Sequence, residues 1–112
     1  MMNRIAVNGI SLEVNESGFL VHTDEWSVAI AEYIAKGDGL EMTSFHWEVV
    51  NFLREYYRLY QIAPMVKVIT REIGKKFGVK KGNTKYLSEL FPGGPAKQAC
   101  KIAGLPNTYG CV

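Results

Sequence analysis

The sequence predicts a mainly α fold (α+β): a small orthogonal bundle of about five helices with an N-terminal β-hairpin and a flexible C-terminal arm. Two observations favour this class. The 112 residues, 47% of them hydrophobic, suffice for one core and leave no room for a second, so residues 1–112 are expected to form a single domain. Apolar residues recur at helical spacing through most of the chain, whereas a strand pattern occurs at its start.

The expected hairpin and first helix occupy the first third of the chain. Asn8-Gly9 lies among β-branched residues within 5–14, and this dipeptide favours the type I′ turn of a hairpin. Thr23 or Asp24 is the expected N-cap of a helix that Gly37 ends. Its apolar residues follow one another at i, i+3, i+4, i+7 and i+8, namely Trp26, Ala29, Ile30, Tyr33 and Ile34.

Two longer helices are expected next. Thr43 can cap a helix over about 44–60, whose stripe of Trp47, Val50, Leu53, Tyr57 and Tyr60 predicts the central core helix. Pro64 suits the first turn of the following helix, because a proline lacks the N–H that this turn leaves unpaired. That helix buries Val66, Ile69, Ile73 and Phe77 and ends before Gly78.

The last two helices are short. Asn83 or Thr84 can cap a brief helix that runs through Leu90 and is stopped by the Pro-Gly-Gly sequence at 92–94. Pro95 is expected to begin the final helix, which Gly104 and Pro106 end. Residues 105–112 show no helical periodicity, and they are expected to form the mobile arm.

The net charge of +2 conceals a division between the two halves of the chain. Residues 1–63 contain four basic and nine acidic side chains, a balance of −5, and residues 64–112 contain nine basic and two acidic ones, a balance of +7. Such a basic half can be steered onto an acidic partner, or it can simply be a solvated lysine face.

Several classes of function lack the residues they need. No apolar run is long enough to span a membrane and no secretory signal is evident, so a cytoplasmic protein is expected. His22 and His46 lack ligands at zinc spacing. The pairs His46 with Glu48 and Asp24 with Glu25 are formal acid/base candidates, but they are better explained as exposed first-turn residues that complement the helix dipole. Gly74, Gly78 and Gly82 do not form a phosphate-binding loop. Neither a metal nor a cofactor is expected in this chain.

The two cysteines are the strongest candidates for chemistry. Cys111 lies on the expected arm, and the seven residues 105–111 can reach roughly 20–25 Å into another protein. Folded back, the arm could bring Cys111 to Cys100, which lies between Lys97 and Lys101. These ammonium groups would favour a Cys100 thiolate, so the pair suits an attacking and a resolving thiol. The alternative is a buried, inert Cys100 with an incidental Cys111.

A second alternative is DNA binding. The two helices around Arg71 and Lys85, joined by a glycine-containing turn in the basic half, could form a helix-turn-helix. The second helix is short, however, and Lys80, Lys81 and Lys85 are not the side chains that read base edges best.

The C-terminal residues resemble a known family. Residues 90–100 read LFPGGPAKQAC, 103–106 read AGLP, and 110–112 read GCV. Together with Trp47, NFLREYY at 51–57 and QIAP at 61–64, they are similar to the dissimilatory sulfite reductase gamma-subunit family, the DsrC/TusE type, and particularly to DsrC, which has both C-terminal cysteines. The resemblance covers essentially the whole chain as one DsrC-like domain.

The resemblance implies a sulfur carrier rather than a stand-alone enzyme. Its site residues would be Cys111, which carries the sulfur as a persulfide, and Cys100, which forms a disulfide or trisulfide with it. Supporting positions would be Lys97, Lys101, Gly104, Pro106 and Gly110. The partners would be the alpha and beta subunits of dissimilatory sulfite reductase, which hold sirohaem and iron-sulfur clusters, and a membrane heterodisulfide-reductase-like complex.

The resemblance also implies a second branch, in which such proteins relay sulfur from sulfurtransferases to a tRNA 2-thiouridylase. Those relatives typically lack the upstream cysteine, so the presence of Cys100 favours the sulfite reductase branch. The loop 78–84 resembles the long version found in sulfur-oxidising bacteria and in tRNA relay proteins, which favours sulfur oxidation. The usual ending Pro-x-Pro-Thr-Gly-Cys-Val is altered, because Asn107-Thr108-Tyr109 follows Pro106 and the second proline is lost.

Overall fold

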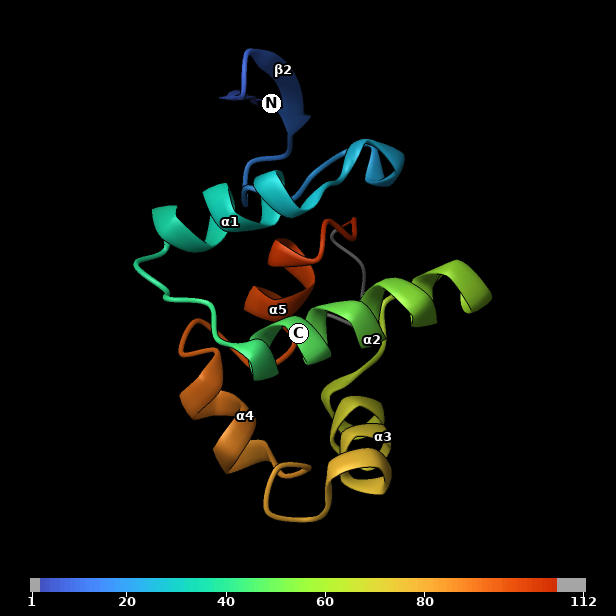
Figure 1. The fold of residues 1–112 in the computed structure, drawn as a ribbon. Helices are drawn as coiled ribbons and strands as arrows, with labels where there is room; N and C mark the ends of the chain where they lie inside the picture. The colour runs from blue at the N-terminus through green and yellow to red at the C-terminus, as the bar shows by residue number, and fades with distance from the viewer. Residues whose placement is uncertain (1–2, 107–112) are drawn as a thin grey trace.

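A computed structural model describes residues 3–106 of the chain. A two-stranded antiparallel hairpin precedes a helical body (Figure 1). The strands are β1 (Asn3–Val7) and β2 (Ile10–Val14), and a 3₁₀ turn covers Thr23–Glu25. The α-helices of the described residues are α1 (Val28–Gly37), α2 (Ser44–Tyr60), α3 (Val66–Phe77), α4 (Thr84–Leu90) and α5 (Lys97–Ile102). The predicted class, a mainly α fold of five helices with an N-terminal hairpin, is confirmed. The predicted flexible arm lies, from residue 107 onward, outside the described residues.

The hairpin forms where the Asn-Gly dipeptide predicts it. Asn8 and Gly9 both have positive φ, 51° and 80°, as a type I′ turn requires. Val7 pairs with Ile10 beside the turn, and Leu12 and Val14 are buried. The hairpin contacts α1, so it covers one end of the helical body (Figure 1).

The start of the first helix differs from the prediction. Thr23 and Asp24 belong to the separate 3₁₀ turn, and α1 begins at Val28 with Ser27 as its N-cap. The Ser27 hydroxyl accepts a hydrogen bond from the backbone N–H of Ile30 at 3.4 Å. Trp26 therefore precedes the helix, and its indole can point at a distant element. Periodicity alone favours an earlier start because Trp26 continues the apolar stripe of α1.

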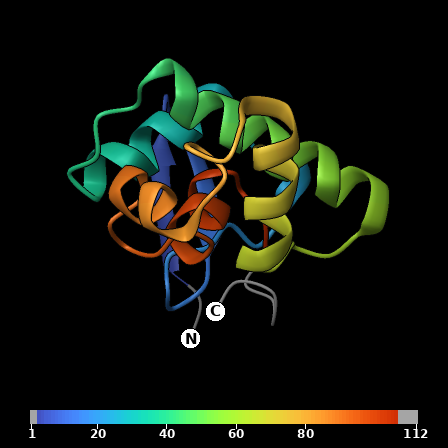
Figure 2. The ribbon, with the colours of Figure 1, turned by 90° about the horizontal axis from the view of Figure 1, so that it is seen from below.

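The short helix α5 lies at the centre of the molecule. It packs against both α1 and α2 (Figures 1 and 2). Half of its side chains are fully buried, and so are apolar side chains that follow it: Ala99, Cys100, Ile102, Ala103 and Leu105. They meet Val49, Val50 and Leu53 of α2 and Ile30, Ala31 and Ile34 of α1 in one core. The segment that carries Cys100 is thus among the least exposed parts of the fold.

Two prolines lie just outside the helices that they were expected to begin. Helix α3 starts at Val66 with Met65 as its N-cap, two residues after the buried Pro64. Helix α5 starts at Lys97, two residues after Pro95. In both cases one residue lies between the proline and the first helical residue. Proline still fixes the direction from which the chain enters the helix, because its ring restricts φ.

His46 is buried, contrary to the expectation of an exposed first-turn residue, with 5% of its surface exposed. Its Nδ1 accepts the backbone N–H of Thr43 at 3.0 Å, and its Nε2 lies 2.7 Å from the carbonyl oxygen of Leu90. The ring also packs edge-on against Phe91, with a distance of 5.1 Å between the ring centroids. His46 therefore ties the start of α2 to the end of α4 and has a structural role.

Candidate functional site

Cys100 lies inside the protein. It is in the middle of α5, and none of its surface is exposed to solvent. Its backbone N–H donates to the carbonyl oxygen of Ala96 at 2.8 Å, so the helix is regular at this point. A thiolate here would lose most of its hydration, and a reagent reaches the sulfur only if the surrounding helices move apart.

The two lysines beside Cys100 have different environments. Lys97 is exposed at the start of α5. The Lys101 ammonium lies 2.9 Å from the carboxylate of Asp38, at the end of α1, and both side chains are about three-quarters buried, with 21% and 24% exposed. The sequence predicts that the positive charge of Lys101 stabilises a Cys100 thiolate. In the structure Asp38 neutralises that charge.

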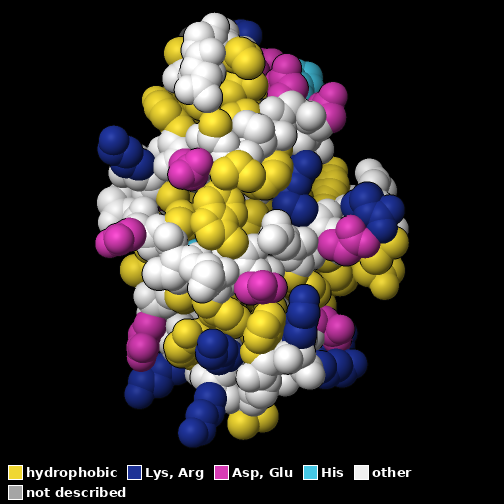
Figure 3. All heavy atoms as spheres, in the orientation of Figure 1, with side chains coloured by type: hydrophobic (Ala, Val, Ile, Leu, Met, Phe, Trp, Pro, Cys, Tyr) yellow, Lys and Arg dark blue, Asp and Glu magenta, His cyan; other side chains and the backbone are white. Residues whose placement is uncertain are grey.

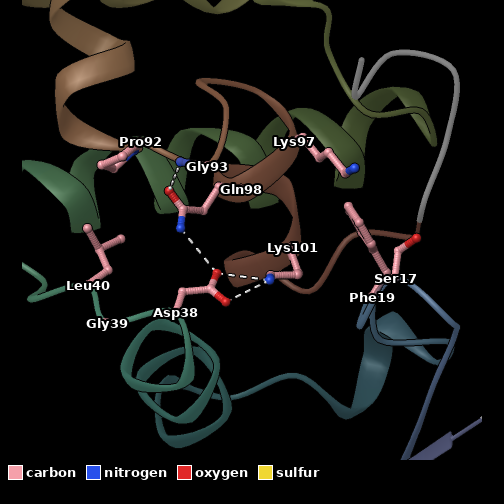
Figure 4. A pocket seen from close by; sticks show the side chains of 10 residues that line it. All are labelled: Ser17, Phe19, Asp38, Gly39, Leu40, Pro92, Gly93, Lys97, Gln98 and Lys101. Atoms are coloured by element: carbon pink, nitrogen blue, oxygen red, sulfur yellow. Dashed lines mark hydrogen bonds and ion pairs between the residues drawn. The ribbon is translucent and has the colours of Figure 1, made fainter.

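Asp38, Gln98 and Lys101 line a surface pocket beside α5 (Figure 4). The Gln98 amide donates to Asp38 at 3.1 Å and its oxygen accepts the backbone N–H of Gly93 at 2.9 Å. These bonds connect the end of α1, the turn at 92–94 and α5, as the dashed lines in Figure 4 show. The network holds α5 in place from its solvent side.

The chain leaves α5 through a tight turn. Gly104 has a φ of 74°, in the left-handed region, and its N–H donates to the carbonyl oxygen of Lys101 at 3.1 Å. The N–H of Leu105 donates to the carbonyl oxygen of Cys100, also at 3.1 Å. Leu105 is 1% exposed. The sequence places the start of the arm at Leu105, but this side chain is packed into the core and belongs to the folded body.

Trp26 and Arg54 fasten this turn from two distant elements. The indole N–H of Trp26 donates to the carbonyl oxygen of Ile102 at 2.9 Å. The Arg54 guanidinium donates to the carbonyl oxygens of Ala103 and Thr23, each at 3.2 Å, and lies 4.4 Å from the centre of the Trp26 ring. Partial burial lowers the pKa of Arg54 below its ordinary value.

These contacts satisfy carbonyl groups at the end of α5 that have no partner within the helix. Gly104 completes the arrangement, because a Cβ at this position would lie 2.7 Å from Cγ of Trp26. We call Trp26, Arg54 and Gly104 the root clamp. The root clamp fixes the position and direction of the chain immediately before the segment that carries Cys111.

Replacing Arg54 by methionine tests the root clamp. Arg54→Met keeps much of the stem volume but removes two charge-assisted hydrogen bonds and the cation–π contact, so the free energy of unfolding should fall by about 1–3 kcal/mol. Urea denaturation measures this change. Arg58→Met is the matched control, since Arg58 is exposed and pairs with the exposed Glu55, and it should change stability much less. Equal losses in both variants would contradict the role of the clamp.

Sequence reasoning missed Trp26 and Arg54 as site residues. Arg54 lies four positions after Val50 and seven after Trp47, so it shares the apolar face of its helix. A charged residue on such a face is the signal that could have identified it, since a partly buried arginine is normally hydrogen-bonded. The contact between Trp26 and Ile102 spans 76 positions, and no local pattern predicts it.

The other predicted site residues divide into two groups. Pro106 is partly buried and is the last described residue. Gly110 and Cys111 lie outside the described residues, so the structure does not test their predicted roles. Within residues 3–106, no group of three or more His, Cys, Asp and Glu side chains is placed to hold a metal ion. Nor does any helix in that range combine the length and apolarity that crossing a membrane requires.

The model of the family described as DsrC-like protein matches residues 6–112, nearly the whole chain and both cysteines. The chain belongs to the DsrC-like family. It is 42% identical to the sulfurtransferase TusE homolog of Haemophilus influenzae over 95% of this chain and 97% of that protein. The resemblance inferred from the motifs within residues 47–64 and 90–112 is therefore confirmed at the family level.

Solved structures of the family share the fold. The NMR structure of Allochromatium vinosum DsrC is 54% identical, covers all of both chains and superposes with a TM-score of 0.90. The crystal structure of the oxidised gamma-subunit of the dissimilatory sulfite reductase (DsrC) from Archaeoglobus fulgidus is 38% identical, covers 98% of this chain and all of that one, and also has a TM-score of 0.90.

Proposed function

We propose that this DsrC-like protein is a cytoplasmic sulfur carrier that accepts a sulfur atom on Cys111 and passes it to another protein. The single observation that carries the proposal is the match to the TusE homolog, a named sulfurtransferase, over nearly the full length of both proteins. A carrier requires only a reactive thiol and a rigid body that presents it. The root clamp supports such a body, because it holds the chain firmly up to Leu105.

Loading of Cys111 transfers one sulfur atom from a donor persulfide to the Cys111 thiolate. The Cys111 thiolate attacks the outer sulfur of a donor persulfide, the donor S–S bond breaks, and the donor leaves as a thiolate. Cys111 then carries the persulfide, and no net oxidation occurs. The protein needs no cofactor of its own for this step. A sulfurtransferase of the relay supplies the donor persulfide.

Cys100 is proposed as the resolving thiol. Its thiolate attacks Cys111 Sγ, the persulfide S–S bond breaks, hydrogen sulfide leaves, and a Cys100–Cys111 disulfide forms. A trisulfide retains the extra sulfur and requires the removal of two electrons, which the sirohaem and iron-sulfur centres of a sulfite reductase partner would have to accept. Because Cys100 is buried, either bridge requires α5 to open, and this separates loading from release.

The proposed acceptor is the next protein of a sulfur relay that ends in tRNA 2-thiouridine synthesis. The TusE name of the 42% identical relative supports this branch over the dissimilatory one that the two cysteines initially favoured. The second candidate is a role with the alpha and beta subunits of dissimilatory sulfite reductase and the membrane complex downstream of it. The 54% identity to DsrC of Allochromatium vinosum and the presence of Cys100 favour that candidate.

A competition assay separates the two branches. The protein, loaded with radiolabelled sulfur on Cys111, is mixed with a purified tRNA 2-thiouridylase and its tRNA, or with sulfite reductase alpha and beta subunits. We expect label to appear in tRNA, and Cys111→Ser to abolish it. Label transfer with sulfite reductase alone would establish the second candidate. The carrier function would be refuted if label reached neither acceptor and Cys111→Ser accepted as much sulfur as the native chain.

A further inference from the structure

One end of the molecule, formed by α3, α4 and their connecting loop, has a basic surface. Residues 67–85 contain seven basic side chains and a single acidic one, Glu72. Lys and Arg side chains gather at the lower end of the face drawn in Figure 3, at the opposite end of the molecule from the hairpin (Figure 1). We define the basic tip by its exposed members: Lys75, Lys76, Val79, Lys80 and Lys85.

The loop of the basic tip is held in one conformation. The Asn83 side-chain amide donates to the carbonyl oxygens of Val79 and Lys80, at 2.9 and 2.8 Å, and its oxygen accepts the N–H of Tyr86 at 2.8 Å. Gly82 packs closely on α3, where a Cβ would lie 2.7 Å from the carbonyl oxygen of Thr70. A surface fixed before binding loses little conformational entropy when it docks.

The charges of the basic tip are available to a partner. The Lys75 ammonium lies 3.4 Å from Glu72 and that of Lys76 lies 3.8 Å from Glu48, but both lysine side chains are more than two-thirds exposed, at 68% and 69%. Exposed pairs of this kind contribute little to stability, so these lysines can exchange them for carboxylates of another molecule.

An apolar side chain among the lysines favours a protein partner over a nucleic acid. Val79 is 81% exposed, next to Lys80. A phosphate backbone offers no pocket for it, whereas protein interfaces combine an apolar centre with a charged rim. Asn83, the nearby residue best suited to read bases, uses its amide to hold the loop. Helix α4 has seven residues and is short for a recognition helix, so the helix-turn-helix interpretation gains no support.

We propose that the basic tip docks onto an acidic protein surface with a small apolar depression that receives Val79. Given the proposed carrier function, on which this inference rests, the partner is the sulfurtransferase that donates sulfur. Docking through the basic tip leaves α5, which lies at the centre of the molecule, clear of the contact (Figure 1). The basic tip thereby orients the carrier on the donor.

The test measures the second-order rate of sulfur transfer from a persulfide-loaded donor sulfurtransferase to this protein. Lys80→Glu/Lys85→Glu should lower the rate about 10–100-fold at low salt, and the difference should shrink at about 0.5 M salt. Val79→Ser should lower it about 3–10-fold at both salt concentrations, because its contribution is apolar. Arg4→Glu/Lys36→Glu is the control, with the same change in net charge at exposed positions outside the basic tip.

Glutathione persulfide separates this proposal from the carrier function. All variants should load from this small donor at the native rate. When loading from the small donor is equal, either of two results with the donor protein refutes docking at the basic tip. In the first, sulfur transfer to Lys80→Glu/Lys85→Glu is as fast as transfer to the native chain. In the second, transfer to the control variant is as slow as transfer to Lys80→Glu/Lys85→Glu. If the native chain does not load from the small donor, the carrier function fails instead. Retained transfer together with charge-dependent binding of labelled tRNA would assign the tip to nucleic acid and overturn the proposal.

Discussion

Replacing Gly104 by alanine should lower the free energy of unfolding by about 2–4 kcal/mol. Two costs combine in this substitution. The backbone φ of 74° is unfavourable for any residue with a Cβ, and the added methyl group would overlap the base of the Trp26 side chain. Trp26 cannot retreat without losing its 2.9 Å hydrogen bond to Ile102 and its contact with Arg54. Thermal or urea denaturation measures the loss.

Gly37→Ala is the matched control for this experiment. Gly37 ends α1 and does not have positive φ, and the Cβ of an alanine at this position would meet no other atom within 4 Å. Alanine there should leave stability unchanged or raise it slightly, since alanine favours the helical state. If Gly104→Ala changed the free energy of unfolding as little as Gly37→Ala, the root clamp would not hold the turn after α5. The proposal of a rigid body that presents Cys111 would then be refuted.

The Cys100 thiol should react with an external disulfide reagent about 10³-fold or more slowly in the native protein than in the unfolded chain. Cys111→Ser provides a chain in which Cys100 is the single thiol. Its sulfur is fully buried in α5 between α1 and α2, so a reagent must wait for the helices to separate. Absorbance of the released thiolate follows the reaction.

Two comparisons make the protection of Cys100 interpretable. The same variant in concentrated guanidinium gives the rate of an accessible thiol. Gly104→Ala, combined with Cys111→Ser, should speed native labelling, because a weaker root clamp makes opening of α5 less costly. Native labelling at the unfolded rate would mean that Cys100 is accessible without opening, and the proposed separation of loading from release would be wrong.

Local sequence patterns predict much of this fold because they reflect local physics. Asn8-Gly9 determines the hairpin turn, Asn83 caps α4 by accepting the N–H of Tyr86, and Gly104 ends α5 in the left-handed conformation. In each case the preference belongs to a few neighbouring residues, and tertiary contacts reinforce it. The sequence also identifies Cys100, between Lys97 and Lys101, as a candidate for chemistry.

The remaining features depend on contacts between distant residues. The sequence predicts His46 at the surface, yet it bonds to Leu90, 44 positions away. It predicts that Lys101 supports the Cys100 thiolate, yet Lys101 pairs with Asp38, 63 positions away. Arg54 and Trp26 meet only because α2 and the segment before α1 converge on the end of α5. Periodicity identifies buried faces but does not specify which distant groups meet there.

In the proposed mechanism Cys111 carries the sulfur and Cys100 releases it. Mass spectrometry of the intact protein and its peptides, after reaction with glutathione persulfide, tests both roles together. We expect Cys100→Ser to accumulate one added sulfur atom on Cys111 and Cys111→Ser to gain no sulfur. The native chain should first carry the same persulfide and then convert it slowly, as α5 opens, to a Cys100–Cys111 disulfide with release of hydrogen sulfide. Sulfur on Cys111→Ser at the native level, or native release of sulfide by Cys100→Ser, would contradict this division of roles.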